Sequence, residues 1–167
     1  AFGSEQLKTR YLPSLAEGTR IAAFATTEAG AGSALAAVAT RAVVHEGALR
    51  GSGTKIYVTN GGLAHGYTIL ASTPGLGGAR RGHSMIFLER EDAGLSLGPE
   101  EDKLGLRGSS TCTLNLDDLS VPMDRVIGAA GQGMKQIAHV LAWGRTAMAA
   151  GCCGSSAAAL AATTEHV

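Results

Sequence analysis

The sequence lacks most of the features that assign a function class on their own. Basic and acidic residues are equal in number, 14 of each, so the chain has no net charge to attract nucleic acid or an anionic membrane surface. The three cysteines show neither Cys-x-x-Cys nor Cys/His ligand spacing, which argues against a disulfide framework and a zinc site. The longest apolar run, residues 147–162, is interrupted by glycines and serines and falls short of the roughly 20 apolar residues that cross a bilayer.

These absences favour a cytoplasmic protein with reduced thiols, no metal site, no membrane span and no nucleic-acid partner. The first residues also lack the basic stretch and apolar core of a signal peptide. What is present is enough apolar material for a folded core. The 167 residues are 45% hydrophobic and 17% charged, which fits one domain of ordinary size with a helical appendage.

Periodicity divides the chain into three zones. Residues 1–20 form a connecting piece, in which a short helix is capped by Ser4, continues through Tyr11 and stops at Pro13. In residues 21–125 strand-like runs are separated by glycine-rich turns. Examples of these runs are 41–44, 55–59, 67–72, 84–89 and 112–116. This zone predicts a mainly β fold, a small antiparallel β-barrel or sandwich with flanking helices.

Residues 126–167 are the third zone, which is helical from near Gly131. Apolar residues recur at helical spacing up to Met148, and after Gly151 the composition is rich in alanine, glycine and serine. The last residues carry no helix stop signal. We therefore expect an Ala/Gly-rich helix in an excerpt from a longer protein, or in a chain that needs a partner to cover this helix.

Two polar segments are the most informative part of the strand-rich zone. Residues 25–33 combine two threonines, a glutamate, two glycines and a serine, and backbone N–H groups in such a loop can approach a phosphate or a heterocycle closely. Residues 55–62 end a β-like run with an aromatic ring, a hydroxyl group and an Asn-Gly turn signal. Taken alone, the first segment is more typical of an ordinary glycine-rich hairpin loop, because short motifs often match by chance.

Four segments, taken in order, resemble the acyl-CoA dehydrogenase family. Residues 26–33 are similar to the family's TE-x-x-x-GSD loop, and residues 55–62 to its K-x-W-I-TNG strand. Residues 102–122 resemble its K-x-G-x-R-x-S-x-T…F-x-D-V-x-VP stretch, and residues 143–145 its Gly-Arg-containing helix. The likeness runs from residue 5 to the end of the chain.

The resemblance implies a fold and an activity. Residues 21–125 would be the family's middle, flavin-binding β-barrel domain, residues 1–20 the end of its N-terminal helical domain with a linker, and residues 126–167 the start of its C-terminal helical domain. The family's enzymes carry FAD and dehydrogenate an acyl thioester of coenzyme A or of an acyl carrier protein. A glutamate takes the α-proton, flavin N5 takes the β-hydride, and electrons leave through an electron-transferring flavoprotein or another acceptor. Members are commonly homo-oligomers.

The resemblance also implies roles for particular residues. The cofactor-binding residues would be Phe24, Thr26, Thr27, Gly32, Ser33, Tyr57 and Thr59. The substrate-binding residues would be Ser33, Trp143 and Arg145. Two of them have structural alternatives, Tyr57 as an aromatic side chain in a strand core and Arg145 as a salt-bridge partner of Glu28. Arg80 and Arg81 would reach phosphates of the substrate carrier or, more commonly for such a loop, lie in solvent.

Three positions depart from the family pattern. Ala34 replaces the aspartate of the GSD motif, Tyr57 replaces a tryptophan, and Gly144 occupies one possible position of the catalytic base. Glycine has no side chain to accept a proton, so we expect no catalytic residue in this chain and a base beyond it. Two other interpretations stay open: a flavin-dependent oxidase or monooxygenase of the same architecture, and a non-catalytic assembly module.

Overall fold

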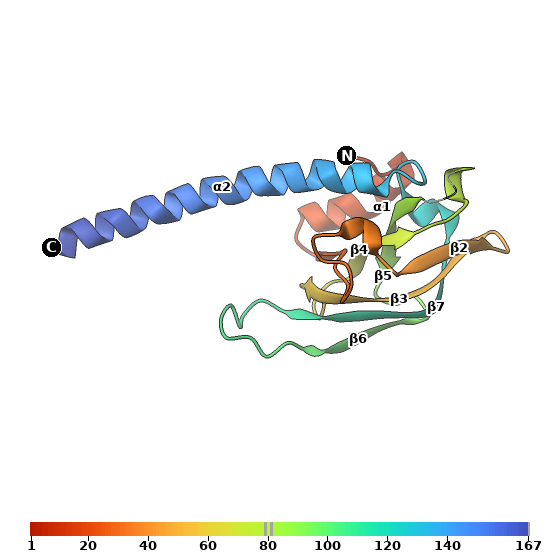
Figure 1. The fold of residues 1–167 in the computed structure, drawn as a ribbon, viewed down its shortest axis with the longest axis horizontal. Helices are drawn as coiled ribbons and strands as arrows, with labels where there is room; N and C mark the ends of the chain where they lie inside the picture. The colour runs from red at the N-terminus through yellow and green to blue at the C-terminus, as the bar shows by residue number, and fades with distance from the viewer. Residues whose placement is uncertain (79, 81, 167) are drawn as a thin grey trace. The chain divides into compact units, whose positions relative to one another are not determined.

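The computed structural model describes residues 1–78, 80 and 82–166. It contains two compact units, residues 1–134 and residues 135–167, which are described separately. Figure 1 shows the order of the helices and strands along the chain.

Within the described residues, the first unit is built on eight strands. They are β1 (Ala22–Ala25), β2 (Arg41–His45), β3 (Ala48–Thr59), β4 (Gly66–Ser72), β5 (His83–Glu89), β6 (Leu95–Glu100), β7 (Thr111–Pro122) and β8 (Val126–Ile127). Three short 3₁₀ turns lie between them: η1 (Leu35–Ala37), η2 (Leu76–Gly78) and η3 (Met123–Arg125). The five strands expected from the sequence are all present, and β3 and β7 are longer than expected. Strands β1, β6 and β8 are not among the runs named from the sequence.

The strands form one mixed sheet, so the expectation of a purely antiparallel sheet is wrong. The order is β6-β7-β3-β2-β4-β5-β8, with β1 beside β4. Strand β1 pairs with β4 in parallel, as β2 does at Arg41 and Ser72. Parallel neighbours need a long connection rather than a tight turn, and here the β2–β3 hairpin lies within the connection from β1 to β4.

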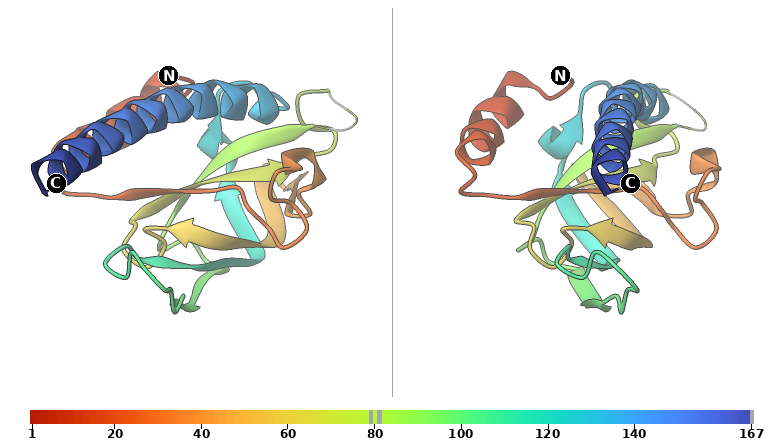
Figure 2. Two further views of the ribbon diagram at one scale, coloured as in Figure 1. Left: turned by 60° about the vertical axis from the view of Figure 1, so that its left-hand side comes forward. Right: turned by 90° about the vertical axis from the view of Figure 1, so that its left-hand side faces the viewer.

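The sheet is strongly curved, as the two views in Figure 2 show. Among the described residues the pairings run as an open path from β6 to β8, so the closed barrel stays a prediction. The largest fully buried side chains of the main core include Leu49, Tyr67, Ile69, Leu88 and Leu114. Each such side chain contributes about 1.5–3 kcal/mol when it leaves water. Apolar and polar residues alternate over 112–116, and the apolar residues Cys112, Leu114 and Leu116 are buried.

Helix α1 (Glu5–Ala16) begins as the sequence predicts and ends later. The Ser4 hydroxyl caps it by accepting a hydrogen bond from the amide of Leu7 at 3.2 Å. The expected stop at Pro13 is wrong, because Pro13 lies inside the helix. A proline removes one amide donor, but the Pro13 carbonyl still accepts from the amide of Glu17 at 2.9 Å.

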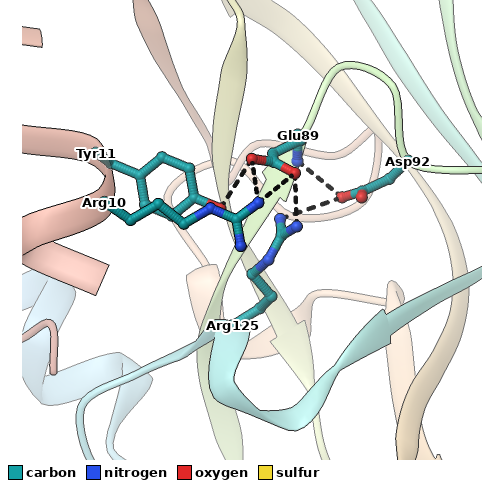
Figure 3. A network of polar contacts seen from close by, with 5 residues as sticks. All are labelled: Arg10, Tyr11, Glu89, Asp92 and Arg125. Atoms are coloured by element: carbon teal, nitrogen blue, oxygen red, sulfur yellow. Dashed lines mark hydrogen bonds and ion pairs between the residues drawn. The ribbon is translucent and has the colours of Figure 1, made fainter. Parts of the chain in front are cut away.

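Helix α1 is held on β5 by an apolar contact and a polar cluster. The rings of Tyr11 and Phe87 lie 4.3 Å apart between centroids. Beside them the Glu89 carboxylate accepts hydrogen bonds from the Tyr11 hydroxyl at 2.9 Å, Arg125 at 2.6 Å and Arg10 at 3.1 Å (Figure 3). We call Arg10, Tyr11, Glu89, Asp92 and Arg125 the Glu89 cluster. It joins α1, β5 and η3 at one carboxylate.

The second unit is formed by α2 (Gly133–His166), a helix of 34 residues that enters this unit at Lys135. The helix expected from near Gly131 is therefore confirmed, and it continues through Gly151 and Gly154 without a break. Among the described residues, no helix is both long and apolar enough to cross a membrane. The cytoplasmic location and the domain boundaries after residues 20 and 125 stay predictions.

Candidate cofactor-binding site

The two polar segments singled out in the sequence lie side by side in the first unit. The carbonyl oxygen of Thr27, two residues after β1, accepts a hydrogen bond from the amide of Ile56 in β3 at 2.9 Å. Strand β1 has its ladder partner in β4 rather than β3, so this bond is a direct link between the two segments.

A buried ion pair lies next to that link. Lys55 Nζ and Glu28 Oε1 are 2.6 Å apart, and the two side chains are 0% and 7% exposed. Lys55 also donates to the Leu70 carbonyl in β4 at 2.6 Å. One ammonium group therefore connects β3, β4 and the loop that follows β1.

The Glu28 carboxylate also closes residues 28–40, the part of the loop that begins with Glu28. It accepts hydrogen bonds from the backbone amides of Ala39 at 2.6 Å and Thr40 at 3.1 Å. Burial alone would raise the pKa of Glu28, but the hydrogen bonds from Lys55, Thr40 and Ala39 outweigh it and hold that pKa below its ordinary value. The carboxylate is thus ionised at neutral pH and fixes both ends of residues 28–40.

A β-bulge determines which side chains of β3 face outward. Lys55 is in register with Leu114 and Val58 with Cys112, so two residues of β3 lie opposite one residue of β7. Tyr57 has a φ of 54°, a left-handed conformation uncommon outside glycine and asparagine. Lys55 and Val58 consequently both face inward, and Tyr57 is 63% exposed. This exposure excludes the alternative of Tyr57 as a core aromatic residue.

The candidate cofactor residues of β1 and β3 share the outer face of the sheet. Ala23, Ala25 and Val58 belong to the core, so Phe24, between the two alanines, points the other way, as strand geometry requires. Phe24 is 40% exposed, and Thr59 is exposed as well. We call Phe24, Tyr57 and Thr59 the outer-face residues. They present two aromatic rings and a hydroxyl group to solvent.

The loop after β1 provides the remaining candidates. Glu28 and Ala31 exchange backbone hydrogen bonds of 3.1 and 3.0 Å in a tight turn. Thr26 and Thr27 are half-buried, whereas Gly32 and Ser33 are exposed. A Cβ atom added to Gly32 would meet no atom within 4 Å, so packing within this chain does not require a glycine there.

The Asn60-Gly61-Gly62 turn after β3 rests on the segment that precedes β7. The amide of Asn60 donates to the Ser110 carbonyl at 2.8 Å, and the amide of Gly62 donates to the Ser110 hydroxyl at 3.0 Å. A Cβ atom on Gly61 would lie 2.5 Å from Cys112 Sγ, so this turn has no room for a side chain. Sequence reasoning missed these contacts, because a serine 48 positions away has no local signal.

The K-x-G-x-R segment has a structural role within residues 103–111. The Lys103 ammonium contacts the Ser109 carbonyl and donates to the Thr111 hydroxyl at 2.9 Å. Arg107 Nε donates to the Lys103 carbonyl at 2.9 Å. These bonds close the loop on itself, so Lys103 and Arg107 both hold the backbone of this loop.

The predicted substrate residues Trp143 and Arg145 lie on α2 in the second unit, as Gly144 does, and all three are exposed. Their substrate role stays a prediction.

The Glu28 carboxylate is the salt-bridge partner considered for Arg145 in the sequence. In the structure this carboxylate is bonded to Lys55 and to the backbone amides of Ala39 and Thr40. Arg80 is exposed, and Arg81 lies outside the described residues. Within the described part of the chain there is no group of three or more histidine, cysteine or carboxylate side chains that could hold a metal ion.

Comparison with known proteins finds the family that the four segments resemble. The family model "Acyl-CoA dehydrogenase, middle domain" matches residues 23–119. A probable acyl-CoA dehydrogenase of Bacillus subtilis is 40% identical over 157 residues, which are 93% of this chain and 26% of that protein. The chain spans between 24% and 42% of the length of the curated relatives that it matches.

Solved structures agree with the sequence comparisons. Butyryl-CoA dehydrogenase of Megasphaera elsdenii superposes with a TM-score of 0.75 at 35% identity, over 80% of this chain and 35% of that one. An acyl-CoA dehydrogenase of Bacillus anthracis complexed with FAD superposes with a TM-score of 0.74 at 36% identity, over 80% of this chain and 22% of that one.

Proposed function

Because the chain belongs to the acyl-CoA dehydrogenase family, we propose that its outer-face residues and the loop after β1 bind the flavin ring of FAD. The observation that carries the proposal is that Tyr57 and Thr59 of β3 and Phe24 of β1 are all exposed. A similar structure is known as a complex with FAD, which supports the same assignment.

Each residue has a chemical task in this proposal. The rings of Phe24 and Tyr57 offer flat apolar surface, and aromatic side chains exposed to this extent gain stabilisation when a planar ligand covers them. The hydroxyl group of Thr59 donates a hydrogen bond at N5 of the flavin, and Thr26 and Thr27 bind its polar edge. The exposed backbone at Gly32 and the hydroxyl of Ser33 contact the pyrophosphate.

The reaction we propose is α,β-dehydrogenation of an acyl thioester, carried on coenzyme A or on an acyl carrier protein. FAD supplies the hydride acceptor when it is bound. The residues of this chain bind and orient it, while Trp143 and Arg145 contribute to the substrate site. We further propose that the chain is a fragment of the enzyme, because its relatives are much longer and Gly144 has no group that accepts a proton.

The partners follow from the same proposal. Electrons leave through an electron-transferring flavoprotein or another acceptor, and the enzyme is a homo-oligomer. Oxidation by oxygen and a purely assembly role are the two competing functions. Binding of FAD by this chain argues against the assembly role, and slow reoxidation of the reduced flavin by oxygen argues against the oxidase.

A pair of matched threonine variants tests the flavin site. Thr59→Val removes the proposed N5 donor, whereas Thr54→Val removes an exposed threonine of the same strand on the other side of the bulge. We expect Thr59→Val to weaken FAD binding about tenfold, the effect of one hydrogen bond to a ligand, and Thr54→Val to leave it unchanged. Fluorescence titration measures both, and equal dissociation constants for Thr59→Val and the unmodified chain would contradict the placement of Thr59.

A further inference from the structure

We propose that the Glu28–Lys55 pair is a positioning device, which holds the loop after β1 and the outward-facing part of β3 at a fixed separation for the cofactor. This inference rests on the proposed function. Neither residue reaches the ligand face, because Lys55 is 0% and Glu28 is 7% exposed. Both therefore act through their neighbours in the chain rather than by contact with the cofactor.

The pair and the neighbouring backbone bond act as two points of attachment. Glu28 follows Thr27 directly, and Lys55 precedes Ile56 directly. The side chains are joined at 2.6 Å, and the Thr27 carbonyl accepts from the Ile56 amide at 2.9 Å. A single bond leaves two segments free to pivot, whereas two adjacent bonds fix their direction as well as their distance.

Each partner is also anchored to a further part of the unit. Lys55 donates to the Leu70 carbonyl at 2.6 Å, which ties it to β4. Glu28 accepts from the amides of Ala39 and Thr40, which ties it to the residues that enter β2. The pair thus fixes the loop that carries Thr26, Thr27 and Ser33 relative to the sheet.

Lys55 also defines where the bulge begins. It is the last residue of β3 in register before the shift, and Val58 is the first in register after it. Both face inward, so the chain between them has one residue too many for regular alternation. The anchored Lys55 keeps that extra residue at Ile56–Tyr57, and this placement turns Tyr57 and Thr59 outward.

The burial of a charged pair argues against a role in stability alone. Replacement of a buried ion pair by apolar residues of similar volume is often neutral or stabilising. An apolar pair in the same place would fill the space but would not direct two backbone amides at one carboxylate. What the ion pair adds over an apolar pair is therefore the orientation that its charge-assisted hydrogen bonds impose on the backbone.

The experiment compares two pair-removing variants of the full chain by FAD titration. Glu28→Gln/Lys55→Met removes the buried pair while it keeps an acceptor for the amides of Ala39 and Thr40. Arg50→Met/Asp118→Asn removes an exposed pair of the same 2.6 Å length, also between β3 and a neighbouring segment. Amide hydrogen exchange of core residues in β4 and β5 verifies that each variant is folded.

We expect the buried-pair variant to raise the dissociation constant for FAD at least tenfold and to change the visible circular dichroism of bound flavin. The exposed-pair variant stays within twofold and keeps the spectrum. A folded buried-pair variant with the original dissociation constant and spectrum overturns the inference alone. No binding by the unmodified chain contradicts the proposed function, and the positioning role with it.

A second variant applies where the double substitution prevents folding. Lys55→Arg retains the buried charge but replaces a compact ammonium group by a longer planar fork, which changes the separation that the pair imposes. We expect a threefold to tenfold rise in the dissociation constant together with a changed spectrum. An unchanged dissociation constant and spectrum in folded Lys55→Arg overturns the inference.

Discussion

Two carboxylates of the first unit, Glu28 and Glu89, each join several segments, and they do so in different ways. Glu28 is paired with a fully buried lysine and with two backbone amides. Glu89 accepts from Tyr11 and two arginines, and its side chain is 19% exposed. The first arrangement fixes the backbone of the candidate site, whereas the second attaches a helix by its side chains. Backbone amides cannot choose another rotamer, so the Glu28 site is the more rigid of the two.

The largest effect should come from breaking the buried pair on one side only. Lys55→Met leaves the Glu28 carboxylate buried without its counter-ion, and loss of one partner from a buried pair costs about 3–5 kcal/mol. Urea unfolding followed by circular dichroism measures the difference. Arg50→Met is the control, since its pair with Asp118 is exposed on both sides and contributes about 0–1 kcal/mol. Equal losses in the two variants would mean that burial of the Glu28–Lys55 pair does not increase its contribution to stability.

A smaller effect should appear in the Glu89 cluster at alkaline pH. Burial, and then the hydrogen bond to Glu89, raise the pKa of Tyr11 from 10.0 to about 12. The folded state thus holds the proton more tightly than the unfolded state, so this contribution to stability is complete below pH 10 and is lost as the pH rises toward 12. The loss amounts to about 2 kcal/mol.

The Tyr11→Phe variant isolates this titration from that of the lysines. Its free energy of unfolding should lie below that of the unmodified chain at pH 9, and the two curves should converge between pH 10 and 12. Chemical unfolding at several pH values measures both curves. A constant difference over that range would mean that Tyr11 does not titrate with a raised pKa.

The sequence predicted the strands that are rich in apolar and β-branched residues and missed those that are short or contain turn residues. Residues 112–116 alternate regularly and lie in β7 as expected. Strand β6 reads Leu-Ser-Leu-Gly-Pro-Glu, and its glycine and proline are typical of a turn rather than a strand. The parallel pairing of β1 with β4 has no local signal, because it depends on where the rest of the chain returns.

The candidate site shows a similar limit. Residues 55–59 alternate between polar or aromatic and apolar residues, which in a regular strand places Lys55, Tyr57 and Thr59 on one face. The bulge separates them, so that Lys55 is buried while Tyr57 is exposed. The segments themselves were identified from their residue types, but the Glu28–Lys55 pair depends on a contact across 27 positions, and the bulge depends on the pairing of β3 with β7. Of this pair and the bulge, the sequence indicated only Lys55, as the lysine of the family's strand motif.

The most direct test of the flavin site is the amide NMR spectrum of the 167-residue chain during addition of FAD. The proposal predicts that chemical shifts change in two stretches, residues 24–33 and residues 56–62, and that the exposed loop at residues 101–109 stays unchanged. A spectrum that does not respond to FAD, or one that responds only outside those two stretches, would contradict the assignment of the outer face of β1 and β3 as the cofactor site.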